Sequence, residues 1–128
     1  MTDNDSLSLN GVNFLFTLRQ KYTKELDSLY FCLNSCPYQD IRDGFTKSID
    51  ATKRNLSLVN KHIEDYSSAC FELEHLRATS FGNVSTEEYR FRTSVLKKVM
   101  RDAEEYNKTM CLAYTVSLLM DHLVKLAK

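Results

Sequence analysis

Four cysteines and three histidines are the side chains that could bind a transition metal. Cys32 and Cys36 are four residues apart, so on a helix both thiols would lie on one face, a spacing that can bind zinc. No second pair accompanies them, because Cys70 and Cys111 are far apart in the sequence. The cysteines are therefore expected to be small buried side chains, and we predict that the chain holds no metal and no cofactor.

Catalytic groups are equally sparse. Glu72 and His75 form the Glu-x-x-His pair from which helical bundles build di-iron sites, but Leu73 occupies the apolar seam, so both are expected to point outward. Cys36 lies at a predicted helix end and also continues an apolar seam. The sequence contains neither a glycine-rich phosphate loop nor a Gly-x-Ser-x-Gly motif. We therefore predict a protein that is not an enzyme and has no small-molecule substrate.

A basic cluster of five cations falls within twelve residues: Arg90, Arg92, Lys97, Lys98 and Arg101. Acidic residues surround it, and the formal net charge of the chain is zero, with 17 basic and 17 acidic residues. Binding to nucleic acid needs an excess of cations, so no nucleic-acid partner is predicted. The cluster is either a solvated face or a surface on which Arg90, Lys97 and Arg101 steer an acidic protein partner.

Three stretches have a helical period, and their positions predict an all-α protein. The first helix is expected over about 12–35, because Pro37 disfavours helix in the residue before it. A second covers about 38–79, where apolar residues follow a heptad pattern from Phe45 to Leu73. The third covers about 86–127, after Ser85 and Glu88 in capping-box spacing. Only three glycines and one proline are present, too few for the many turns of a β fold.

The lengths of these helices predict an antiparallel three-helix bundle, joined by a turn at Phe81, Gly82 and Asn83. At 1.5 Å per residue the long helices span about 63 Å and the first about 36 Å, so the first reaches only to about residue 62. The three-helix part is then expected to contain residues 38–62 and 103–128, with a hairpin projecting at the 63–102 end. The apolar seam of the third helix is expected to continue through Ser117, Met120 and Val124. Residues 1–10 form a polar tail that we expect to be disordered, and 11–128 a single domain.

The projecting hairpin has more apolar residues than a two-helix seam can bury. These are Phe71, Leu76, Phe91, Val95 and Met100. Large aromatic side chains are costly to leave in water, so we predict that another protein or a second copy of the chain covers them. The alternative is that the first helix or the N-terminal tail packs further along the hairpin than its length suggests.

These features favour a non-catalytic interaction subunit or adaptor, oligomeric or part of a complex, that binds through apolar helix faces. The first eleven residues lack a secretory leader and the cysteines suit a reducing compartment, so a cytoplasmic or nuclear location is expected. A lipid-surface binder that uses the C-terminal helix is the alternative. No membrane-spanning run is expected, because Ser117, Asp121 and His122 interrupt the stretch from Met110 to Leu126.

Overall fold

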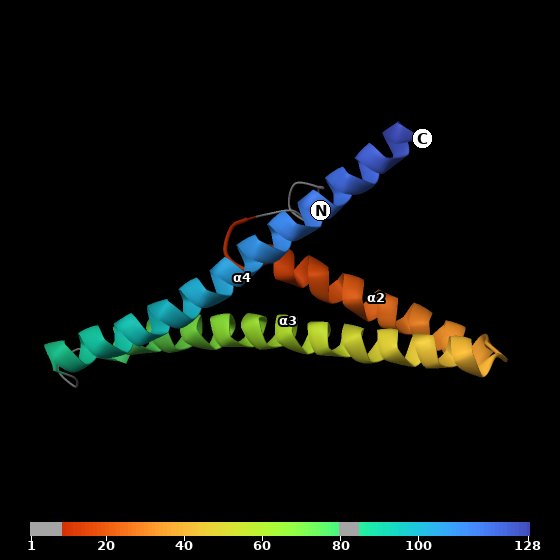
Figure 1. Cartoon of the computed structure of the whole chain (residues 1–128). Coiled ribbons are helices and arrows are strands. Elements are labelled where there is room, and N and C mark those ends of the chain that lie inside the picture. The colour runs from red at the N-terminus through yellow and green to blue at the C-terminus, as the bar shows by residue number, and fades with distance from the viewer. Residues whose placement is uncertain (1–8, 80–84) are drawn as a thin grey trace.

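A computed structural model describes residues 9–79 and 85–128, and it contains three helices in those ranges (Figure 1). They are α2 (Asn13–Ser35), α3 (Gln39–Thr79) and α4 (Thr86–Ala127), with no strand among the described residues. Contacts join every pair of helices, which confirms the prediction of an all-α bundle. The predicted turn at Phe81, Gly82 and Asn83 and most of the predicted tail lie outside the described residues.

Both ends of α2 are capped by side chains from other helices. The N-cap residue makes no side-chain hydrogen bond, but Asn107 of α4 accepts one from the backbone N–H of Leu15 at 3.1 Å. At the other end, Arg42 Nη1 donates to the carbonyl oxygens of Leu33 and Cys36 at 2.6 and 3.1 Å. These bonds satisfy backbone groups that a helix end leaves without intrahelical partners, and they fix α2 between its neighbours.

The start of α4 confirms the helix start predicted at Ser85. Its hydroxyl oxygen accepts a hydrogen bond from the backbone N–H of Glu88 at 3.2 Å. The Glu88 carboxylate lies 2.6 Å from a guanidinium nitrogen of Arg92, one turn further along. Because both charged side chains are about half exposed, this ion pair stabilises the helix by only a few tenths of a kcal/mol.

The core lies where the first half of α2 fits between α3 and α4 (Figure 1). Its buried side chains come from all three helices and from the residue before α2: Val12, Phe14, Leu15, Leu18, Val59, Ile63, Ala103 and Cys111. The Phe14 ring also meets the Tyr114 ring of α4 at a centroid distance of 5.6 Å. The N-terminal half of α2 therefore packs against both α3 and α4, which also contact each other directly.

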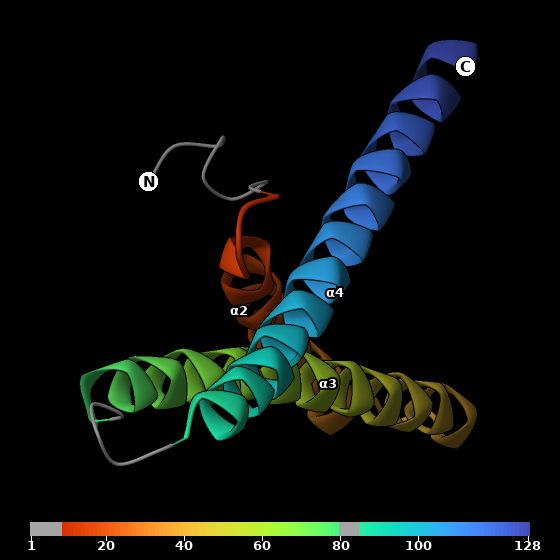
Figure 2. The same ribbon diagram turned by 90° about the vertical axis from the view of Figure 1, so that its left-hand side faces the viewer.

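The C-terminal end of α4 leaves the body of the protein (Figures 1 and 2). Every residue from Val116 to Lys128 is exposed, and Cys111 is the last buried residue of the helix. The prediction that residues 103–128 belong entirely to the three-helix part is therefore wrong. Its seam through Ser117, Met120 and Val124 lies in water, and this end of α4 is a second projecting part besides the predicted hairpin.

The sequence of α4 explains why the helix departs. At about 100° per residue, the side that carries Ala103 and Tyr114 continues into Ser117, Asp121 and Lys125. Ala103 is buried and Tyr114 packs against the core, so this is the side that faces α2 and α3. A polar continuation gains nothing by packing against apolar neighbours, whereas water solvates it well.

His62 provides a pH-dependent contribution to stability. Its ring stacks on Tyr106 of α4, with centroids 4.0 Å apart and planes 18° from parallel. Burial lowers the pKa of His62 below the usual 6.5, and it outweighs Asp65 and Asp102, which favour the protonated form. The unfolded chain therefore binds this proton more readily than the folded chain, so the stabilisation is complete well above pH 6.5 and is lost as the pH falls below 6.5.

We expect His62→Phe, which keeps a flat ring at this position, to remove that pH dependence. The measurement is the free energy of unfolding from urea titrations between pH 5 and pH 8, a range of about three units around the usual histidine pKa. The wild-type chain should lose more stability than the variant as the pH falls through this range. Equal losses in the two proteins would contradict the role of His62.

Candidate protein-interaction site

The end of α3 and the start of α4 form a two-helix tip, in which Ala69, Leu73 and Leu76 are the buried residues of α3. No core residue of α2 belongs to this part of the fold. Two helices cover only the residues between them, so apolar side chains on their flanks stay exposed. The predicted anchors lie in this tip, and the structure separates them into two groups on different sides of α4.

Four of the five predicted anchors line one groove, which we name the tip groove. Phe71 of α3 is 72% exposed, Phe91 of α4 is 69% exposed, and Val95 is also exposed. Leu76 is 7% exposed, so its side chain belongs to the packed interior beneath the groove and only its edge is accessible. The tip groove encloses about 480 Å³. Its size and apolar lining suit side chains from one face of a helix.

Few charges border the tip groove. On α3 the Phe71 ring lies parallel to the His75 ring, with centroids 6.5 Å apart. Glu72 and Arg92 also line the groove, and Arg92 is already paired with Glu88. Because the rim charges are close to balanced, burial of apolar surface would supply most of the binding free energy there.

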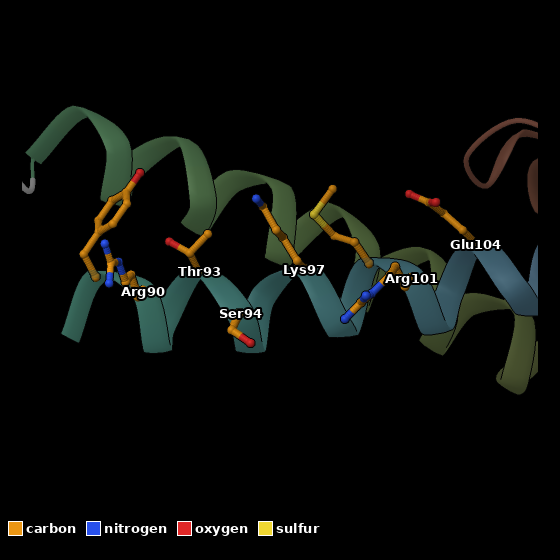
Figure 3. A pocket seen from close by; sticks show the side chains of 8 residues that line it. Arg90, Thr93, Ser94, Lys97, Arg101 and Glu104 are labelled. Atoms are coloured by element: carbon orange, nitrogen blue, oxygen red, sulfur yellow. The ribbon is translucent and has the colours of Figure 1, made fainter. Parts of the chain in front are cut away.

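Met100 and the three predicted steering cations lie on a different side of α4 from the tip groove. Arg90, Lys97 and Arg101 line a shallow depression of about 500 Å³ formed by α4 alone. Figure 3 shows Lys97 and Glu104 extending on the same side of the helix, so an acid accompanies the cations. The structure therefore brings the three cations together, but it places them apart from the tip groove.

Sequence reasoning missed a second apolar surface, which we name the C-terminal stripe. It consists of five exposed residues of α4: Leu112, Val116, Leu119, Leu123 and Leu126. The sequence signal is the apolar width of residues 110–126, which exceeds one core-facing stripe. In the structure that width faces water, on the side of α4 away from the core.

The C-terminal part of α4 is also apolar over a longer stretch than expected. The helix contains an 18-residue window that is long and apolar enough to cross a membrane, and only 6% of that window is buried. The expectation that no run reaches this composition is therefore wrong. Asp121, His122 and Lys125 lie in the same part of α4, and such groups are costly in hydrocarbon. Length and composition by themselves do not distinguish a span from other apolar helices.

None of the four cysteines forms a disulfide, and they differ in accessibility. Cys32 is exposed, Cys36 and Cys70 are partly buried, and Cys111 is buried. Burial raises the pKa of the Cys111 thiol, which lowers its reactivity at neutral pH. Within residues 9–79 and 85–128, no group of three or more metal-binding side chains lies together. Elemental analysis of the purified chain would test the prediction that it binds no metal.

Comparison of the chain with protein-family models, with curated proteins and with solved structures found no significant match. No residue role can therefore be transferred from a relative. The tip groove and the C-terminal stripe are the two surfaces on which a function can be argued, and both are apolar surfaces rather than clusters of reactive groups.

Proposed function

We propose that this chain is a non-catalytic interaction subunit or adaptor of a cytosolic or nuclear complex, and that the tip groove binds a helix of a partner protein. The observation that carries the proposal is the exposure of Phe71 and Phe91 on opposite walls of an apolar groove. Each aromatic ring buries roughly 150–250 Å² when a partner covers it. Two such rings are typical of the anchors that dominate binding free energy in protein interfaces.

The proposed binding mode follows from the positions of the walls. Phe71 and His75 are one turn apart on α3, and Phe91 and Val95 are one turn apart on α4. We take α3 and α4 to run antiparallel here, so a partner helix would lie between two ridges with an apolar side chain above Leu76. Arg90, Lys97 and Arg101 would increase the association rate of an acidic partner without touching the groove.

Replacement of both Phe71 and Phe91 by serine is expected to abolish partner binding. Loss of each aromatic anchor should weaken affinity by about thirtyfold, at roughly 2 kcal/mol, so loss of both should weaken it by at least several hundredfold. The measurement is capture of proteins from the native lysate on the immobilised full chain, with circular dichroism to show that helix content is unchanged.

Phe31→Ser is the matched control for this experiment, because Phe31 is equally exposed but lies on α2, outside the tip groove. A protein retained by wild type and by Phe31→Ser, but not by the double variant, would support the proposal. Retention of the same proteins by the double variant would exclude the tip groove as their binding site.

Binding to a lipid surface through the end of α4 is the second candidate, and the exposure of the C-terminal stripe favours it. Helices that lie in a membrane interface combine such a stripe with many cations on the polar face. This segment has Lys125 and Lys128 but also Asp121, so anionic lipids would attract it only weakly. Flotation with anionic vesicles tests this alternative.

A further inference from the structure

We infer that the C-terminal stripe is a self-association surface, on which the same stripe of a second copy packs as a coiled coil. The inference does not depend on the tip groove, since the two surfaces share no residue. It follows from three observations on residues 112–128: the side of α4 that they occupy, their spacing, and the charges beside them.

The chain cannot cover this stripe with its own α2 and α3. At 100° per residue, Leu112, Leu119 and Leu123 lie on average roughly 160° around the helix from the core-facing residues of α4. The stripe therefore points away from the body, along the free end of α4 seen in Figure 2. Moving the end of α4 toward α2 would present Asp121 and Lys125 instead, so neither α2 nor α3 supplies the covering surface.

The spacing and the flanking residues favour a second copy. The steps between stripe residues are four, three, four and three, which are the a and d positions of a heptad. The positions that flank a coiled-coil seam hold no lysine, arginine or carboxylate; they are Ala113, Thr115, Met120, His122 and Ala127. Two identical helices can therefore meet without repulsion between like charges, while the charged residues of this segment stay on the far side.

The apolar area is sufficient for a dimer of moderate affinity. Met120 flanks the stripe, and the six side chains together are 55–70% exposed. Burial of roughly 60–120 Å² on each would remove about 350–700 Å² from water per copy. A standard protein interface takes about 800 Å² from each partner, so we expect a monomer–dimer equilibrium that depends on concentration.

The test is sedimentation velocity on the full chain over about a hundredfold range of concentration, so that an equilibrium of moderate affinity is visible. Leu119→Asp places a carboxylate at a d position of the stripe, whereas Leu118→Asp makes the same change one residue away, outside the stripe. We expect the wild-type chain and Leu118→Asp to dimerise alike, and Leu119→Asp to raise the dissociation constant by more than about tenfold. Circular dichroism of both variants controls for helix content.

The inference would be overturned by a wild-type chain that stays monomeric throughout, by equal weakening of the dimer in Leu118→Asp and Leu119→Asp, or by full dimerisation of Leu119→Asp. A monomeric chain that floats with phosphatidylserine vesicles, and loses flotation on Leu119→Asp, would assign the stripe to a lipid surface instead. The Phe71→Ser and Phe91→Ser double variant should dimerise normally. Loss of its dimer would place the contact between copies at the tip groove, and would likewise overturn the inference.

Discussion

Replacement of Phe14 by alanine is expected to lower the free energy of unfolding by about 3–5 kcal/mol. Its side chain is 1% exposed and lies in the cluster where α2, α3 and α4 meet, against the ring of Tyr114. Alanine would leave a cavity there, because the three helices around it are also fixed to one another by other contacts. The loss is about a fifth or more of a typical total stability of 5–15 kcal/mol.

Phe31→Ala on the same helix is the control, because Phe31 is 72% exposed and its truncation should change stability by less than about 0.5 kcal/mol. Urea unfolding followed by circular dichroism measures both variants. A loss at Phe14 as small as the loss at Phe31 would mean that the first half of α2 does not pack between α3 and α4.

Asn107→Ala is expected to cost about 1–3 kcal/mol, although alanine favours helix more than asparagine does. Asn107 is fully buried, and its Oδ1 accepts a hydrogen bond from Leu15 N–H in the first turn of α2. Loss of this acceptor weakens the capping of α2 in a place that water reaches poorly. The Leu15 N–H would keep only its contact with the Val12 carbonyl at 3.0 Å.

Asn55→Ala is the matched control for Asn107→Ala, because Asn55 is exposed in the middle of α3. Both changes carry the same gain in helix propensity, so the difference between the two unfolding free energies reports what the buried Asn107 side chain contributes through hydrogen bonding and packing. If the two variants were equally stable, Asn107 would contribute nothing beyond its place in the helix.

The helices were predictable because local patterns determine them. Pro37 marked the boundary between α2 and α3, and Ser85 marked the start of α4, where its hydroxyl oxygen accepts from Glu88. Apolar residues three and four apart predicted helix without reference to the rest of the chain. These signals depend only on neighbouring residues, and the structure confirms three helices in residues 9–79 and 85–128.

Packing was harder to predict, because a helix can have two apolar sides and the period alone does not say which one faces the core. The predicted continuation of the α4 seam through Ser117, Met120 and Val124 is exposed. The sequence does not indicate a buried Asn107, because asparagine is seldom fully buried. Its hydrogen-bond partner, the backbone N–H of Leu15, is 92 residues away in the sequence.

The candidate site was predictable in composition but not in shape. Phe71, Phe91 and Val95 are exposed near the tip, where the excess of apolar residues was found. Leu76 packs inward and Met100 lies on another side of α4, because small differences in angle around a helix decide which side a residue occupies. Whether any of these residues binds a partner stays a prediction.

Because α4 is one continuous helix, it fixes the distance between the tip groove and the C-terminal stripe. The helix contains neither glycine nor proline between Thr86 and Ala127, so its backbone offers no built-in hinge. Phe91 in the tip groove and Leu119 in the C-terminal stripe belong to this one rod and are about 40 Å apart along its axis. Two molecules that occupied both surfaces would be held at that separation, and the chain would serve as a spacer between them.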